Sequence, residues 1–184
     1  MKLLIVTASV RKGRAGAKVA DWFAGRVEED GRFEALRVDL KELGLSYEMP
    51  EALPSSVSDG QYEEESDRAW AAKVNEADAV VFVSPEYNHG MPASLKNALD
   101  HLYKEWVNKP TGFVGYGAAG APYSQAALGL VAGWLKLDVV SARVGISEIW
   151  AAFDDKGELN FADHYAREAT TVLDSLAKKV AAKS

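Results

Sequence analysis

Three short segments of this 184-residue chain carry side chains suited to an anion or a flat ring, and each follows an apolar run. The first, residues 7–17, contains Arg11, Lys12 and Arg14 and precedes a helical pattern. A helix N-terminus offers unpaired N–H groups and the positive end of the helix dipole, which together hold a phosphate. Without the Walker spacing the segment suits a single terminal phosphate, although a solvated turn could have the same composition. The candidate contacts are Ser9, Arg11, Arg14, Ala15 and Gly16.

The second segment follows the apolar run 79–83 and precedes the helical stripe that starts at Leu95. Its prolines and glycine fix the path of the chain, Tyr87 supplies a flat face and Asn88 supplies an amide, so a planar heteroaromatic ring fits against it. His89 has two open roles, because it could donate to an electron acceptor or only shape the loop. The candidate contacts are Pro85, Glu86, Tyr87, Asn88, His89 and Gly90.

The third segment, residues 115–120, matches the dinucleotide pattern G-x-G-x-x-G and contains Tyr116 and Gly117. That pattern expects an acidic residue about 20 positions later, at the end of the following strand. Asp138 has the distance but stands before the next apolar run, which predicts that it lies at the opposite end of the strand. We therefore interpret the glycines as a loop that approaches a flat ligand closely, with a ligand-free tight turn as the alternative.

Alternating strand and helix patterns must position these segments. Val-, Ile- and Phe-rich runs predict strands at 3–6, 33–38, 79–83, around 113–114 and at 139–146. Amphipathic stripes predict helices between them and a last helix from about 163 to 182. This order predicts an α/β fold, a flavodoxin-like doubly wound five-stranded parallel sheet in the order 2-1-3-4-5 with helices on both faces, in one domain over 1–184. The carboxyl ends of the strands would bring the three segments to one edge.

The composition limits the chemistry. The chain has no cysteine, so disulfides, thiolate nucleophiles and cysteine-ligated metals are excluded and redox chemistry would need a cofactor. A net charge of -6 argues against nucleic acid or anionic lipid as partners. The apolar run at 3–6 is too short for a signal peptide or membrane span, which favours a cytoplasmic protein. His101 and His164 lack a partner at metal-ligand spacing, so we expect surface or packing roles and no metal site.

Other residues receive structural expectations. The proline-bearing, acidic stretch 40–65 is interpreted as a solvated connector, with a mobile lid as the alternative. Trp22, Trp70 and Trp134 fall on helical stripes and are expected in the core, whereas Tyr103 and Trp106 are expected at a subunit interface.

Taken together, the three segments resemble the NADPH-dependent FMN reductase family of flavodoxin-like quinone, flavin and azo reductases. The resemblance rests on Ser9-x-Arg11, on the Pro-Glu-Tyr-Asn run at 85–88 and on Leu-Lys-Asn-Ala-Leu-Asp at 95–100. It extends to 105–106, 109–110, the glycine segment and 153–157. Ala8 and Gly16 depart from the family pattern, where glycine and a capping serine or threonine are common, and each departure could weaken phosphate binding.

The resemblance implies that Ser9, Arg11 and the loop through Gly16 bind the FMN phosphate. It implies that 85–90 lines the isoalloxazine edge and that Gly117 with its neighbours closes the other side. NADPH or NADH would reduce FMN, and a small electron acceptor such as a quinone, free flavin, azo compound or metal ion would then be reduced without an obligatory protein acid or base.

The family also implies a homodimer, with a tetramer as the alternative, built from the helices within 95–106 and 126–137. Two other functions stay open at this point. They are a non-enzymatic FMN-binding electron carrier and a regulatory module on the same fold.

Overall fold

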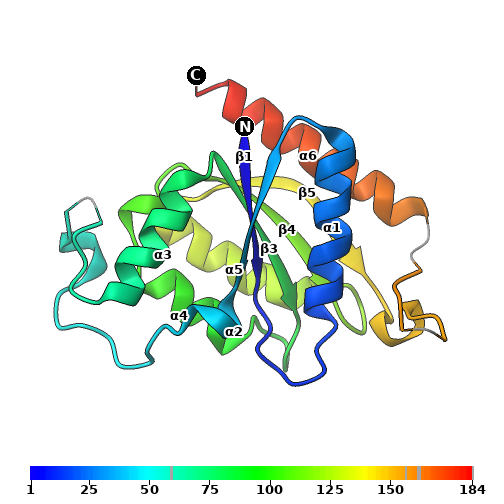
Figure 1. Ribbon diagram of the computed structural model, residues 1–184, viewed down its shortest axis with the longest axis horizontal. Coiled ribbons are helices and arrows are strands. Elements are labelled where there is room, and N and C mark those ends of the chain that lie inside the picture. Colours follow the sequence, from blue (N-terminus) through cyan, green and yellow to red (C-terminus); the bar gives the residue numbers. More distant parts are fainter. Residues whose placement is uncertain (59, 156, 161–162, 184) are drawn as a thin grey trace.

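The computed structural model describes residues 1–58, 60–155, 157–160 and 163–183. Its described strands form one all-parallel five-stranded sheet with the order β2-β1-β3-β4-β5, as predicted (Figure 1). The strands are β1 Lys2–Thr7, β2 Glu34–Asp39, β3 Ala79–Pro85, β4 Pro110–Tyr116 and β5 Asp138–Ile146. Residues of β3 and β4 are buried throughout, which explains why these strands appear in the sequence as continuous apolar runs.

Helices cover both faces of the sheet, in agreement with the doubly wound prediction (Figure 1). Alternate side chains of β1 divide between two cores, with Leu4 and Val6 facing one and Leu3 and Ile5 facing the other. The first core includes residues of α3, α4 and α5, and the second includes residues of α1 and α6. The helices are α1 Gly16–Asp30, α2 Leu40–Leu43, α3 Glu65–Glu76, α4 Ala93–Asp100, α5 Pro122–Leu135 and α6 Asp163–Ala181.

The parallel register gathers the three predicted segments at one edge. Thr7 at the end of β1 pairs with Val83, and Pro85 at the end of β3 pairs with Tyr116 at the end of β4. Asp138 pairs with Pro110 at the start of both strands, so it lies at the opposite edge from the glycine segment, as predicted. Asp138 is therefore not at the glycine edge of β5, where a dinucleotide motif needs its acid.

The stretch 40–65 is more structured than a solvated connector. It contains α2 and a 3₁₀ turn at Pro54–Ser56. Tyr62 is buried, and its hydroxyl donates to the Glu105 carboxylate over 2.7 Å. The Ser46 carbonyl lies 2.9 Å from Nε2 of the buried His101. Most described side chains of 41–65 are exposed or partly exposed, as expected of a solvated connector, but these contacts attach the segment to the core.

Two expectations for tryptophan are wrong. Trp134 is 77% exposed, because α5 buries Leu128, Ala132 and Leu135 and turns Trp134 outward. Trp106 is fully buried, and its indole N–H donates to the Leu99 carbonyl over 3.1 Å. Helical periodicity predicts that Trp134 lies on a helix, but it does not show which face of that helix packs against the sheet. No helix in the described part of the chain is both long and apolar enough to cross a membrane.

Candidate functional site

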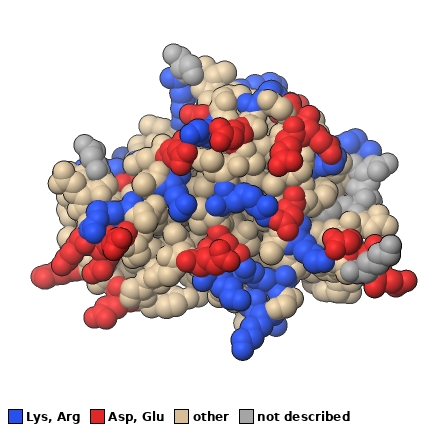
Figure 2. Space-filling model, viewed as in Figure 1, with Lys and Arg blue, Asp and Glu red and all other residues tan. Residues whose placement is uncertain are grey.

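The first segment forms the connection from β1 to α1. It combines a buried hydroxyl, that of Ser9, with exposed positive side chains at its tip. Ser9 is fully buried, and its Oγ lies 2.6 Å from the Tyr87 hydroxyl of the second segment. Arg11 and Lys12 are exposed, and Figure 2 shows Lys and Arg side chains gathered at the tip of this connection. The first two predicted segments therefore meet through a hydroxyl pair.

The two arginines of this segment have different surroundings. The Arg11 guanidinium lies 5.5 Å from the centre of the Tyr87 ring, a cation–π contact at the site edge. Arg14 instead donates to the Ser9 carbonyl and forms an ion pair with Asp39 at the end of β2. Arg14 thus braces the loop within the protein, whereas Arg11 is the exposed cation beside Tyr87.

Helix α1 begins without a side-chain cap. Its N-cap position is Ala15, no side chain accepts from its first N–H groups, and its first turn contains no acidic residue. Such an end carries uncompensated N–H groups and the positive end of the helix dipole. Ala15 and Gly16 thus stand where the sequence predicted a place for an anion.

The second segment is a tight two-residue turn. Tyr87 and Gly90 exchange backbone hydrogen bonds of 3.0 Å in both directions, and Asn88 and His89 between them have φ values of 49° and 60°. Left-handed backbone is uncommon outside glycine, although asparagine and histidine adopt it more often than most residues, and such conformations gather at ligand-binding sites. Pro85 is buried as the last residue of β3, so the strand holds this turn at the sheet edge.

Two side chains of this turn join it to α5. The Glu86 carboxylate accepts from the backbone N–H groups of Tyr123 over 2.8 Å and Ser124 over 3.3 Å. The His89 ring stacks on the Tyr123 ring with centroids 4.2 Å apart and planes 12° apart. Glu86 therefore supplies from another loop the cap that α5 lacks locally, and its side chain turns to the helix.

The glycines of the third segment have separate roles. A Cβ on Gly115 would lie 2.6 Å from the Gly120 carbonyl oxygen, and one on Gly120 would lie 2.7 Å from the Gly145 carbonyl oxygen. These two glycines let the loop pack against itself and β5, as in a tight turn. Gly117 differs, because the nearest atom to its Cβ position is the Glu86 nitrogen at 4.0 Å. Gly117 therefore lies beside the second segment without the close contacts of the other two glycines.

Tyr116 ends β4 beside Gly117 and is only 4% exposed. Its hydroxyl has no hydrogen-bond partner in the described part of the chain. Burial raises the pKa of Tyr116, and the neighbouring Tyr87 adds to the rise while the Ser9 hydroxyl and Arg14 oppose it, so the Tyr116 hydroxyl stays protonated at neutral pH.

The family model described as NADPH-dependent FMN reductase matches residues 1–151. The chain belongs to the NADPH-dependent FMN reductase family. It is therefore an oxidoreductase with FMN as cofactor and NAD(P)H as hydride donor.

Relatives of this reductase agree with that membership. An NAD(P)H-dependent FMN reductase of Schizosaccharomyces pombe is 41% identical over 138 residues, which cover 75% of this chain and 68% of that protein. A 2-hydroxy-1,4-benzoquinone reductase of Burkholderia sp is 30% identical over 144 residues, covering 74% of this chain and 73% of that one. The structure of an NAD(P)H:(acceptor) oxidoreductase from Paracoccus denitrificans aligns with a TM-score of 0.75 at 23% identity, covering 97% and 98% of the two chains, and so supports the fold.

The residues of the reductase fit the cofactor that its family uses. A phosphate monoester needs donors and positive charge, and the uncapped start of α1, exposed Arg11 and the unpartnered Tyr116 hydroxyl lie in adjoining loops. The isoalloxazine ring of FMN is flat and binds between flat surfaces. Tyr87 and Gly117 belong to the loops that follow the adjacent strands β3 and β4, so they can lie on either side of such a ring.

Sequence reasoning missed contributors that act across the fold. Tyr123 is 52% exposed and supports His89 from α5. Ser94 donates to the Ala8 carbonyl over 2.6 Å and so fixes the first segment from α4. Only the position of Ser94 early in a helix after Pro92 hinted at a polar contact, and Tyr123 carried no signal. Of the residues expected near the chain end, Lys156 lies outside the described residues.

Proposed function

We propose that this reductase binds FMN among the three loops at the carboxyl edge of the sheet and reduces a small quinone at the expense of NAD(P)H. The observation that carries the proposal is the position of the three predicted segments at one sheet edge: Ser9 and Tyr87 of the first two lie 2.6 Å apart, and Tyr116 of the third pairs with Pro85. Bound FMN would supply the chemistry: it would take hydride from NAD(P)H, leaving NAD(P)⁺, and pass hydride to the quinone, which takes a proton from solvent to become the hydroquinone.

The phosphate end of FMN is assigned to the β1–α1 connection. Ser9 and the first N–H groups of α1, at Ala15 and Gly16, are assigned as donors to phosphate oxygens, and Arg11 supplies an exposed positive charge. Arg14 contributes by positioning, because its guanidinium holds the Ser9 carbonyl and Asp39. Ala8 stands where glycine is common in the family, and Ser94 holds the backbone at this position by donating a hydrogen bond to the Ala8 carbonyl.

The ring end is assigned to the other two loops. The backbone of 85–90 and the side chains of Tyr87 and Asn88 form one wall, and the backbone at Tyr116 and Gly117 forms the other. Glu86 and His89 act through α5, where they fix the separation of the walls. This chain then orients the ring and excludes water from one face, and no protein acid or base is required.

A quinone is the preferred acceptor class. The relative from Burkholderia is named for a benzoquinone, and a flat neutral quinone can stack on the ring that the nicotinamide has left. The exposed His89–Tyr123 pair borders this position with two stacked rings and suits an aromatic guest.

Self-association is proposed through the outer face of α5. Leu130 is 81% exposed and Trp134 77% exposed, one helical turn apart, and Trp134 with Leu53 and Tyr103 lines a cleft of about 340 Å³. The other apolar side chains of 95–106 are mostly buried inside the chain and cannot face a partner. A second copy would cover the exposed face of α5 and make a homodimer.

Light scattering after gel filtration tests the dimer. Trp134→Glu places a charge in the proposed interface and should give a monomer, whereas Trp150→Glu, at a tryptophan that is 64% exposed in another turn, should leave the dimer intact. A monomeric wild type, or dimers from both variants, would contradict the proposed interface.

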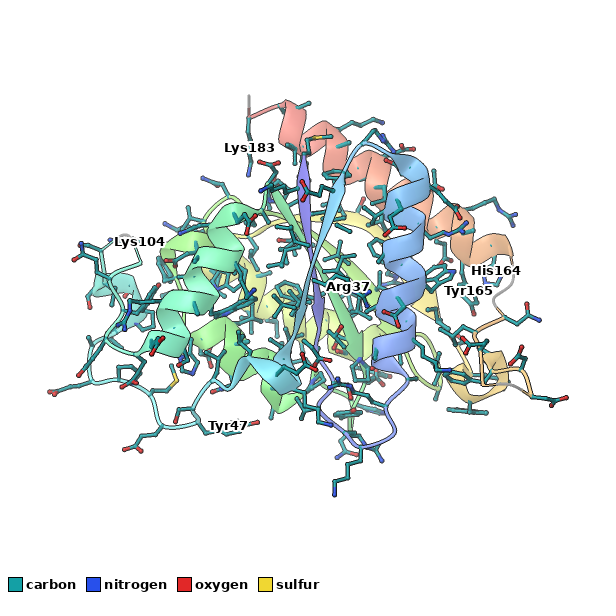
Figure 3. The ribbon with its side chains drawn as sticks, in the orientation of Figure 1. Arg37, Tyr47, Lys104, His164, Tyr165 and Lys183 are labelled. Carbon is teal, nitrogen blue, oxygen red and sulfur yellow. The ribbon has the colours of Figure 1, made fainter. Side chains whose placement is uncertain are left out.

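The activity is tested with apoprotein loaded with FMN under anaerobic conditions. NADPH or NADH should bleach the visible flavin band, and benzoquinone should restore it over many turnovers. Arg11→Gln should weaken FMN binding by about 5-fold or more because a charge-assisted contact to phosphate is lost. Arg37→Gln is the matched control, since Arg37 is exposed and pairs with Asp21 on the surface (Figure 3). Tightly bound FMN without NAD(P)H oxidation by any acceptor would instead indicate an electron carrier.

A further inference from the structure

The Tyr116 hydroxyl is a buried polar group at the site whose place in the fold needs a reason. Tyr116 is 4% exposed, and its hydroxyl lacks a hydrogen-bond partner within the described residues. A hydroxyl removed from water without a partner costs free energy, and a native structure that keeps one usually reserves it for a ligand or an ordered water.

This hydroxyl is directed at the first residue of α1. A Cβ built on Gly16 would lie 2.4 Å from the Tyr116 hydroxyl oxygen and 3.3 Å from its ring Cζ. The same position lies 3.5 Å from the Ser9 Cβ. Tyr116 therefore occupies the space that a side chain at position 16 would need, next to the buried Ser9.

The surroundings favour an anion at this point. Helix α1 presents its positive end there with no side-chain cap and no acidic residue in its first turn. The Ser9 Oγ is hydrogen-bonded to the Tyr87 hydroxyl over 2.6 Å and also interacts with the Tyr116 hydroxyl, whose pKa it lowers. Since burial keeps Tyr116 protonated at neutral pH, its hydroxyl is an available donor at the helix end.

We propose that the Tyr116 hydroxyl donates a hydrogen bond to the phosphate of FMN at the start of α1. It supplies from β4 the hydroxyl that a serine or threonine at position 16 would supply from the helix. The proposal rests on the placement of FMN given above. It makes Tyr116 a determinant of selectivity for FMN over riboflavin, which lacks the phosphate.

The test measures binding of FMN and of riboflavin to apoprotein by flavin fluorescence in a phosphate-free buffer. Tyr116→Phe should raise the dissociation constant of FMN about 10-fold or more, as expected for a hydrogen bond to a charged group, and leave that of riboflavin within about 2-fold. Tyr47→Phe is the control, because Tyr47 is an exposed tyrosine on the segment after α2 (Figure 3). It should change neither constant.

A hydroxyl swap gives the sharper test. Gly16→Ser alone should weaken FMN binding, because its Cβ would meet the Tyr116 oxygen at 2.4 Å. Combining Gly16→Ser with Tyr116→Phe removes that oxygen and returns a hydroxyl from the helix, so FMN affinity should recover by about 3-fold or more over Tyr116→Phe. Gly16→Ala with Tyr116→Phe has the same Cβ without the hydroxyl and should not recover.

Thermal unfolding separates binding from folding. Apoprotein Tyr116→Phe should melt at or above the wild-type temperature, because it loses an unpartnered buried hydroxyl, yet FMN should raise its melting temperature less. An equal loss of FMN and riboflavin affinity would overturn the proposal. So would unchanged FMN affinity in Tyr116→Phe while wild type prefers FMN. Wild type that binds neither flavin would overturn the placement of FMN itself.

Discussion

Removing the Glu86 carboxylate should loosen the connection between the second segment and α5. Helix α5 starts at Pro122 after Ala121 in the left-handed region, and no local side chain caps it. Glu86 reaches it from the end of β3 and accepts from the N–H groups of Tyr123 and Ser124. Glu86→Ala leaves those groups without this acceptor.

The expected loss follows from the two contacts. Removal of a helix cap costs about 0.5–2 kcal/mol, and loss of a negative charge at a helix N-terminus costs about 0.3–1 kcal/mol more. Glu86→Ala should therefore lower the free energy of unfolding by about 1–3 kcal/mol. For a chain of this size, 1 kcal/mol shifts the melting temperature by about 2–4 °C. Glu86→Gln keeps an acceptor but not the charge, so it should lose only about 0.3–1 kcal/mol.

Far-UV circular dichroism of the apoprotein measures these shifts, and a flavin titration measures the effect on the site. Glu28→Ala and Glu28→Gln are matched controls on an exposed position of α1 and should change the melting temperature little. Because Glu86 also fixes the spacing of two loops, Glu86→Ala should weaken FMN and riboflavin alike. A melting temperature for Glu86→Ala within about 1 °C of wild type would show that the carboxylate does not cap α5.

Three further predictions concern the core and the glycine loop. His101→Leu strands the buried Asp67 carboxylate, which lies 2.7 Å from Nδ1, and should cost about 3–5 kcal/mol, most of it recovered when Asp67→Leu is added. Gly120→Ala should destabilise the protein by about 1–3 kcal/mol, because the φ of Gly120 is 74° and an added Cβ would meet a carbonyl oxygen. Gly25→Ala is the control: Gly25 lies in open space on α1, and alanine there should stabilise the protein by about 0.5–1 kcal/mol. Denaturant unfolding measures the His101 and Asp67 variants as well as the two glycine variants. Burial and the hydrogen bond to Glu105 raise the pKa of Tyr62, so above pH 10 the unfolded chain loses a proton that the folded chain keeps, and the free energy of unfolding should fall as pH rises. Tyr62→Phe should reduce this slope by about 1.4 kcal/mol per pH unit. An unchanged slope would contradict the assignment to Tyr62.

The fold was predictable because its strands are buried on both faces. A fully buried parallel strand needs an unbroken apolar run, and β3 at Ala79–Pro85 provides one between two helical stripes. Strand order follows from the handedness of crossovers and from the single switch point of this topology. The meeting of the three segments then required only that parallel strands share a carboxyl edge.

The direction of individual side chains was not predictable, because it depends on contacts distant in sequence. Glu86 turns to Tyr123, 37 positions away, and Arg14 turns to Asp39, 25 positions away. Trp134 was expected in the core and is exposed, whereas Trp106 was expected at an interface and is buried. Spacing along the sequence does not show which face of an element packs against the sheet. From the sequence, glycine at position 16 was expected to weaken phosphate binding. In the structure the Tyr116 hydroxyl occupies the space that a side chain at position 16 would need.

A crystal structure of the protein grown with FMN tests the central claim most directly. We expect electron density for the phosphate at the start of α1, within hydrogen-bond distance of the Tyr116 hydroxyl, and for the ring between the turn at Tyr87–Gly90 and Gly117. FMN bound at any other place, such as the cleft beside Tyr62 and His101, would contradict the proposed site.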